Sequence, residues 1–309
     1  MFNKLIFAFI FATCLFCWYT WRPYQTLWLR FIPNSTTFNI SSSTATLVPI
    51  KIIQFNVDHG GESRIDAILE WLRVQNADIV GFCEANKWQY NLTNIAFAAG
   101  YSYSKIFPTQ HGYPLAVFSK TPIEVIGCHQ KHFERGVLHV KILGVHFFIV
   151  HLNAHSAASR ELETLYLSGL IRKLEVKNVN NHDNKKNKYS TLSSLPLVVV
   201  MVDMNTLSPL DNSMLQNTII ENKTLLQALS SMPCYVAMKK KFLKSPEFHE
   251  FNYVPMQHLL NIDLVDTSDL RLPTEPTNIP CDQARYCPCP HLRLDYMLVS
   301  KQFLSFPII

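Results

Sequence analysis

Asp78-Ile79-Val80-Gly81-Phe82-Cys83-Glu84 is an apolar run that lies between two acidic residues and ends in a glutamate. A run of this kind, with no alternation of polar side chains, is typical of a strand that is buried on both faces. Three other stretches are also apolar and also end in polar residues: Ile53-Gln54-Phe55-Asn56, Val202-Asp203-Met204-Asn205 and Arg293-Leu294-Asp295-Tyr296. We therefore expect four buried strands with polar side chains at their ends.

Outward from these strands the chain alternates further apolar runs with helical patterns. Strands are expected at residues 51–56, 78–83, 115–119, 137–143, 145–150, 195–202 and 292–299. One helix is expected after Gly60-Gly61, where Ile65, Ile68, Leu69 and Leu72 share one side, and a second over residues 159–174. Residues 177–194 are polar and are expected to form a disordered surface insertion.

This order of elements predicts an α+β fold. Many strands with helices between them indicate a four-layer α/β sandwich, in which two mixed or antiparallel sheets pack face to face and helices flank them. A doubly wound parallel sheet is the alternative. The hairpin expected at Gly144 and the lack of a Gly-rich phosphate loop weigh against it.

The first 22 residues differ from the rest of the chain. Residues 5–19 are apolar apart from Thr13, follow Lys4 and lead into the aromatic cluster Trp18, Tyr19 and Trp21. We expect residues 1–22 to be a signal anchor or a cleaved signal peptide, with a buried soluble helix as the third alternative. The protein is then either a single-pass membrane protein with a lumenal or extracellular domain, or secreted.

A linker is expected at residues 23–49, which are rich in Ser, Thr and Asn, and a folded domain over residues 50–309. Four Asn-x-Ser/Thr sequons favour a glycoprotein, at Asn34, Asn39, Asn91 and Asn222. No protein partner is predicted.

The cysteines allow two interpretations. Cys281, Cys287 and Cys289 lie close to His291, but their spacing matches no common zinc motif, so a disulfide-pinned loop that includes Cys234 is preferred to a zinc site. Cys83 and Cys128 are expected to be small buried hydrophobic residues.

The net charge of +5 is too small to indicate a nucleic-acid binder. The lysine runs at residues 185–188 and 239–241 are expected in solvated loops.

The polar residues that end the strands would meet at one rim of a sandwich: Asn56, Glu84, Asp203, Asn205 and Asp295. A buried carboxylate cluster is costly without a cation, and hard oxygen donors favour Mg²⁺, with Mn²⁺ as the alternative. Such an ion would polarise a phosphoryl oxygen. Asp203 is placed to orient or deprotonate an attacking water, and His151, after the strand at 145–150, to donate to a phosphate oxygen.

The order of these motifs resembles the endonuclease/exonuclease/phosphatase superfamily, which includes pancreatic-type deoxyribonucleases. The resemblance covers residues 50 to about 300 and rests on Gln54-Phe55-Asn56, Asp78 to Glu84, Arg135-Gly136, Val150-His151-Leu152, Asp203-Met204-Asn205 and Arg293-Leu294-Asp295-Tyr296. It implies that Glu84 binds Mg²⁺ with help from Asn56, that Asp203 and Asn205 position the nucleophile and the phosphate, and that Asp295 orients a catalytic histidine.

Two features depart from the family pattern. Val202 stands where the family usually carries Gly, and the family's terminal Asp-His motif is absent from residues 296–309. We therefore expect a C-terminally truncated member that lacks the last strand. The predicted function is Mg²⁺-dependent hydrolysis of a phosphodiester or phosphomonoester in nucleic acid, phospholipid or sugar phosphate. The alternative is an inactive relative that acts as a binding module.

Overall fold

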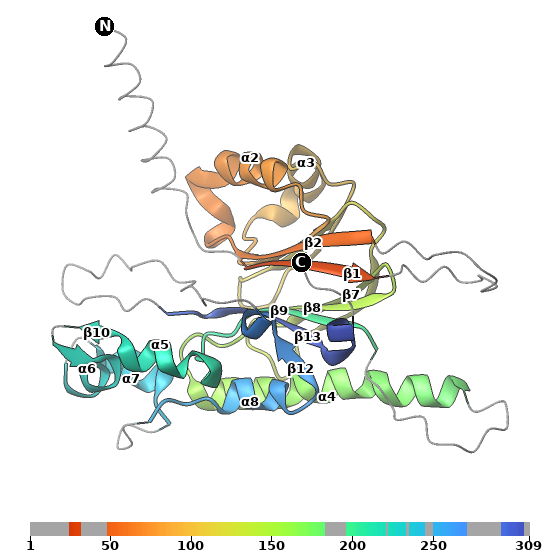
Figure 1. Ribbon diagram of the computed structural model, residues 1–309. Coiled ribbons are helices and arrows are strands. Elements are labelled where there is room, and N and C mark those ends of the chain that lie inside the picture. The colour runs from red at the N-terminus through yellow and green to blue at the C-terminus, as the bar shows by residue number, and fades with distance from the viewer. Residues whose placement is uncertain are drawn as a thin grey trace, which may run out of the picture.

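The computed structural model describes residues 25–31, 48–182, 196–220, 222–232, 235–244, 250–270 and 292–305. Two mixed sheets pack face to face, and helices cover the outer surface of each (Figure 1). The predicted four-layer α+β sandwich is thus confirmed.

The first sheet has five strands. Their order is β1 (Gln25–Phe31), β2 (Val48–Asn56), β3 (Ile79–Cys83), β5 (Leu115–Ser119) and β4 (Tyr103–Phe107). Only β2 and β3 are parallel. The helices α2 (Ile65–Gln75) and α3 (Leu92–Ala98) pack on its outer face, where Leu72 and Ala96 contact the same core as Phe82.

The second sheet has six strands. Their order is β12 (Leu264–Asp266), β13 (Asp295–Ser300), β9 (Val198–Asp203), β8 (Val145–His151), β7 (Val137–Ile142) and β6 (Glu124–His129). Only β8 and β9 are parallel. The helices α4 (Ala157–His182) and α8 (Val254–Leu260) cover its outer face.

A small cluster of short elements lies in the long connection between β9 and β13. It contains α5 (Asn212–Asn217), β10 (Ile219–Ile220), β11 (Lys223–Thr224), α6 (Leu225–Ser231) and α7 (Val236–Phe242). Its own apolar core includes Leu215, Leu229 and Phe242. At one side of the molecule this cluster extends beyond the sheets (Figure 1).

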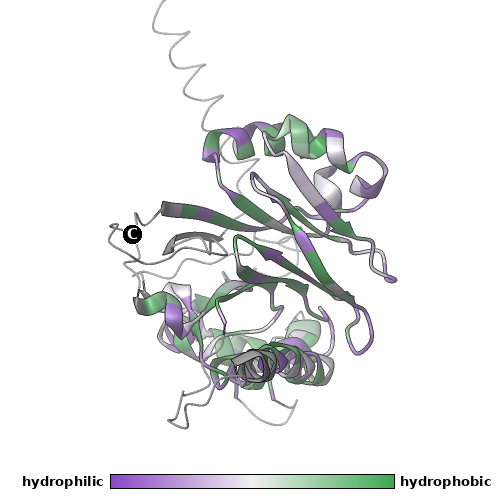
Figure 2. Ribbon diagram, turned by 90° about the vertical axis from the view of Figure 1, so that its right-hand side faces the viewer, coloured by the Kyte–Doolittle hydropathy of each residue, from purple (hydrophilic) through white to green (hydrophobic). Residues whose placement is uncertain are grey.

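The central core lies between the sheets and explains the unbroken apolar runs of the sequence (Figure 2). Every residue of β3, β5 and β9 is buried, because each of these strands is covered on both faces. Gly81 keeps the sheets close: a Cβ at this position would come within 2.8 Å of Met201 Cε on the facing strand β9.

Residues 25–31, which we expected in a linker, instead form β1, which pairs antiparallel with β2 from Gln25 opposite Gln54 to Phe31 opposite Val48. The position next to β2 is therefore occupied by a strand from upstream in the chain. The edge of a sheet offers free backbone groups to any extended segment, so composition alone does not reveal this pairing.

Two further expectations are corrected. The helix α4 continues to His182, into the segment that we expected to be disordered. Cys128 is an exposed free cysteine, because it lies on the edge strand β6, whereas Cys83 is buried as predicted.

Several predictions fall outside the described residues: the N-terminal segment 1–22, the sequons at Asn34 and Asn39, and the group of Cys234, Cys281, Cys287, Cys289 and His291. Among the residues that are described, no helix combines the length and the apolar character needed to cross a membrane.

Candidate active site

The strand ends bring the predicted site residues to one rim of the sandwich. Asn56 ends β2 and lies opposite Cys83, the last residue of the parallel strand β3. In the second sheet His151 ends β8 opposite Asp203, which ends β9. Asp295 begins the antiparallel strand β13 and also lies opposite Asp203. The two sheets thus contribute to a common site.

Asn56 links the acidic residues of the two sheets. Its Nδ2 donates to Glu84 Oε1 at 3.2 Å and to Asp203 Oδ2 at 2.9 Å. Its Oδ1 accepts from the backbone N–H of Asp58 at 2.9 Å, which fixes the orientation of the amide. A neutral amide can hold two carboxylates close together without adding charge, as the sequence predicted for this residue.

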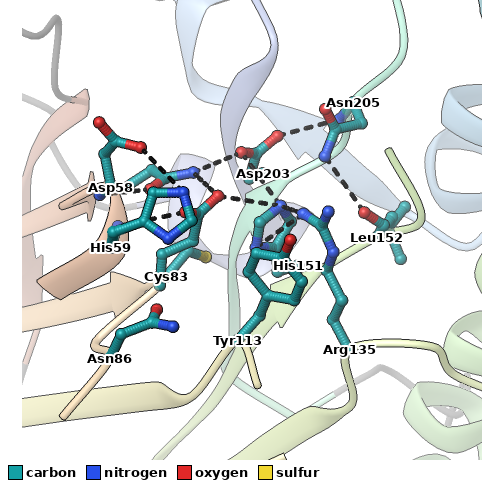
Figure 3. A network of polar contacts seen from close by, with 12 residues as sticks. Asp58, His59, Cys83, Asn86, Tyr113, Arg135, His151, Leu152, Asp203 and Asn205 are labelled. Carbon is teal, nitrogen blue, oxygen red and sulfur yellow. Dashed lines mark hydrogen bonds and ion pairs between the residues drawn. The ribbon is translucent and has the colours of Figure 1, made fainter. Parts of the chain in front are cut away.

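A loop after β2 carries two further residues into the site that the sequence analysis missed. Five consecutive residues, 58–62, have positive φ angles, and Gly60 packs so tightly that a Cβ would lie 2.1 Å from the carbonyl oxygen of Asn86. Trp88 Nε1 fixes the loop by donating to the Gly60 carbonyl at 2.9 Å. Asp58 and His59 are thereby turned toward Glu84 (Figure 3).

Asp58, His59 and Glu84 form a group that is suited to a divalent cation. Their potential ligand atoms all lie within 4.8 Å of one another. The two carboxylates are ligands that Mg²⁺ and Mn²⁺ accept, and the imidazole of His59 makes the set softer than an all-oxygen site. Because Asn56 Oδ1 accepts from Asp58 and its Nδ2 donates to Glu84, its contacts assign it to supporting these acids. Proximity to Asn56 and to the Gly60-Gly61 turn was the available sequence signal for Asp58 and His59.

His151 is buried between the acids and Arg135. Its Nε2 lies 3.5 Å from Asp203 Oδ2 and 3.9 Å from Glu84 Oε1, and Arg135 NH1 contacts the same nitrogen. Burial lowers the pKa of His151 well below its ordinary value, and the charges of Arg135 and Lys241 act in the same direction. The imidazole is therefore neutral at neutral pH.

Arg135 contributes a buried positive charge to this rim. Its guanidinium carbon lies 4.0 Å from the centre of the Tyr113 ring, and both residues face His151 (Figure 3). The next residue, Gly136, has a φ of +81°, and a Cβ there would come within 2.6 Å of the Phe107 ring. The Arg-Gly pair of the sequence therefore serves a tight turn that directs a cation into the site.

The segment after β9 holds Asp203 and Asn205 in place. The backbone N–H of Asn205, a residue with φ of +49°, donates to Asp203 Oδ1 at 3.1 Å. The Asn205 side chain donates to the Leu152 carbonyl at 3.1 Å and accepts from Lys241 Nζ at 2.8 Å. Both ends of this amide are engaged, so its orientation is fixed.

A buried ion network supports the start of β13, where Asp295 lies. Arg293 donates to Asp266 Oδ2 at 2.7 Å and to Asp211 Oδ2 at 3.0 Å. The hydroxyl of Tyr296 donates to the Arg293 carbonyl at 2.8 Å. Asp295 is thus flanked by two residues whose positions are fixed, which explains why the whole Arg-Leu-Asp-Tyr stretch matters to the site.

A sequence profile of the Endonuclease/Exonuclease/phosphatase family matches residues 53–306. The chain belongs to this family. The predicted resemblance is therefore confirmed, and the family match spans all six site residues named from the sequence. A search of curated proteins finds no match.

Solved structures show the same fold as this family member. An AP endonuclease from Archaeoglobus fulgidus is 15% identical, with a TM-score of 0.52, over 82% of this chain and 87% of the other. The 3′ phosphatase NExo from Neisseria, in a variant form bound to a product DNA hairpin, is 13% identical, with a TM-score of 0.49, over 82% and 87% of the two chains. The human Nocturnin catalytic domain is 14% identical, with a TM-score of 0.43, over 82% of each chain.

Proposed function

We propose that this family member is a phosphoesterase that depends on a divalent metal ion and hydrolyses a phosphodiester or a phosphomonoester with an activated water. The observation that carries the proposal is the pair of hydrogen bonds from Asn56 to Glu84 and Asp203. They hold a metal-binding acid and a candidate general base on one amide, next to the cation Arg135. Hydrolysis of a phosphate ester requires these groups at one place.

Each residue has a defined task in this proposal. Asp203 accepts a proton from the attacking water, and Asn56 and the Asn205 N–H hold its two oxygens. Neutral His151 and Arg135 donate to phosphate oxygens, on which negative charge builds up as the water attacks.

The metal ion belongs to the other side of the site. Glu84, with Asp58 and His59, would hold Mg²⁺ or Mn²⁺, which supplies Lewis acidity and charge neutralisation at the phosphate. Asn56 keeps the Glu84 carboxylate in position, and Asp295 stands beside Asp203 on the adjacent strand.

The test is hydrolysis of bis(p-nitrophenyl) phosphate and p-nitrophenyl phosphate by the full chain, with Mg²⁺, Mn²⁺ or EDTA. Replacing Asp203 with Asn is expected to lower kcat by a factor of about 10² or more. Asp66→Asn on the exposed side of α2 is the matched control. Turnover that survives both EDTA and D203N would contradict the proposal. A folded chain with no turnover of either ester favours the binding module.

The substrate and the location of the protein are also proposals. Nucleic acid, phospholipid and sugar phosphate all present the required ester, and we propose a protein anchored at or secreted across a membrane by residues 1–22. Support comes from the apolar segment and from the sequons, of which Asn91 and Asn222 are exposed. A mass decrease on glycosidase treatment of the protein from eukaryotic cells would support this location, and an unmodified chain with a cytosolic distribution would contradict it.

A further inference from the structure

One lysine of the run at 239–241 enters the site, although the sequence predicted a solvated loop. Lys241 lies in the last turn of α7, in the connection between β9 and β13. Its Nζ donates to Asn205 Oδ1 at 2.8 Å, whereas the neighbouring Lys240 is more accessible to solvent. Since Asn205 also donates its backbone N–H to Asp203, the ammonium lies two hydrogen bonds away from the candidate general base.

The backbone of α7 is held in place by contacts that do not involve the Lys241 side chain. The guanidinium of Arg160 donates to the Lys241 carbonyl and, at 2.9 Å, to the Asn153 carbonyl in the loop after β8. The Asn252 N–H donates to the Phe242 carbonyl at 2.7 Å, and the Phe242 ring is buried in the adjacent core. The position of the cation is therefore a fixed property of the fold.

The electrostatic surroundings of Lys241 are those of a site that awaits an anion. Burial lowers the pKa of Lys241 to about 8, Arg160 and Arg135 act in the same direction, and Asp203 and Asp295 oppose the shift. The ammonium remains mostly protonated at neutral pH. Among the described residues no carboxylate oxygen lies within 4.0 Å of Nζ, and Asn205 is the one acceptor that Nζ contacts. A partly desolvated cation with spare donors is costly unless a ligand compensates it.

We propose that Lys241 binds a non-bridging oxygen of the substrate phosphate and holds that phosphate beside Asp203. This inference rests on the proposed function. Asn205 orients the ammonium, and Arg135 supplies a second cation on the other side of His151. Two cations flanking the acids would offset the repulsion between those acids and an incoming phosphate.

The test compares Lys241→Met with Lys240→Met on the same helix, using the full chain in detergent. Binding of inorganic phosphate in the presence of Mg²⁺ is measured by calorimetry, and kcat and KM are measured with bis(p-nitrophenyl) phosphate. We expect K241M to weaken phosphate binding about tenfold or more and to raise KM, because it removes a charge-assisted hydrogen bond. K240M should match the unmodified protein. K241R, which keeps the charge, should recover part of the binding.

Folding is checked by thermal unfolding, where K241M is not expected to lower Tm, because it removes a buried charge. Should K241M fail to fold, K241R and K241Q provide the same comparison of charge. Unchanged phosphate affinity in a folded charge-removing variant overturns the inference, and so does a fall in kcat alone, which would assign Lys241 only to positioning Asn205.

The two proposals fail in distinguishable ways. Phosphate binding that depends on Lys241, without turnover of any ester, sustains this inference and removes the proposed function. Turnover that is unaffected in K241M sustains the proposed function and removes the inference. No phosphate binding by the unmodified protein also overturns the inference.

Discussion

A single amide, Asn56, joins acids that belong to different sheets. Glu84 follows β3 in the first sheet and Asp203 ends β9 in the second, and both accept from the same nitrogen. Two carboxylates at this separation repel each other, and both a shared donor and a nearby cation reduce that repulsion. The contribution of each residue can therefore be separated by measuring metal binding and turnover independently.

Replacing Glu84 with Ala should weaken binding of Mn²⁺ by about tenfold or more, because it removes one of two carboxylates from the group with Asp58. Calorimetry on the metal-free protein measures this directly, without any substrate. Glu124→Ala, on the exposed edge strand β6, is the control. Equal Mn²⁺ affinity in both variants would place the metal elsewhere.

His151 should make the stability of the metal-free protein depend on pH. Its pKa is lowered in the folded state, so the unfolded chain takes up a proton near pH 6.5 and the folded chain does not. The stability that is present above this pH is lost as the pH falls below it, by up to about 1.4 kcal/mol per pH unit. Urea unfolding between about pH 5 and pH 7 measures the slope.

His151→Asn should flatten that slope, whatever its effect on the absolute stability. His155→Asn, at an exposed position in the following loop, should leave the slope unchanged. A slope that is the same in the unmodified protein and in H151N would show that the imidazole is not held neutral.

At the scale of elements, the loop after β2 depends on a glycine that no other residue can replace. Gly60 and Gly112 share a φ of +77°, but a Cβ at Gly60 meets the Asn86 carbonyl at 2.1 Å, whereas one at Gly112 meets nothing within 4 Å. Gly112→Ala should cost about 1 kcal/mol of stability through backbone strain alone.

Gly60→Ala adds a clash with backbone to the same strain, so we expect a further loss of about 2 kcal/mol or more. Chemical denaturation of both variants checks the difference. Mn²⁺ affinity should also fall in G60A, because the loop carries Asp58 and His59. Equal stability of the two variants would mean that the loop moves freely and does not fix the metal group.

The strands that carry the site were predictable because they are buried on both faces and therefore read as apolar runs. β5 has the expected bounds, and β3, β7 and β8 differ from theirs by one residue. The weaker signals belonged to elements at the edges, such as β4 and β6, whose side chains are largely exposed or half-buried. The positions of Asn56, Glu84, Asp203 and His151 at one rim followed from the strand ends.

The missed site residues reach the rim through loops and a short helix. Asp58 and His59 depend on a run of positive φ angles, and Lys241 depends on how α7 is held by Arg160. Neither arrangement has a periodic pattern, since each results from contacts between distant parts of the chain. A run of three lysines gives the same sequence signal whether all of them are solvated or one of them is buried.

At the scale of the whole molecule, β1 protects the edge of the first sheet. Removing residues 1–31 should expose the backbone of β2 and promote association of the protein, with a lower unfolding midpoint. Removing residues 1–24 leaves β1 in place and is the matched control, because both variants lack the apolar segment. Light scattering and thermal unfolding compare them. Two equally monomeric and equally stable variants would show that β1 contributes little.

The direction of β1 also sets where the upstream chain joins the domain. Because β1 is antiparallel to β2, Gln25 lies opposite Gln54, two residues before Asn56. Any surface that holds residues 1–22 would thus face the catalytic rim across a tether of only a few residues. Substrate supply would then be governed by the areal density of phosphate esters on that surface and by the effective concentration that a short tether creates, with diffusion through bulk solvent of secondary importance.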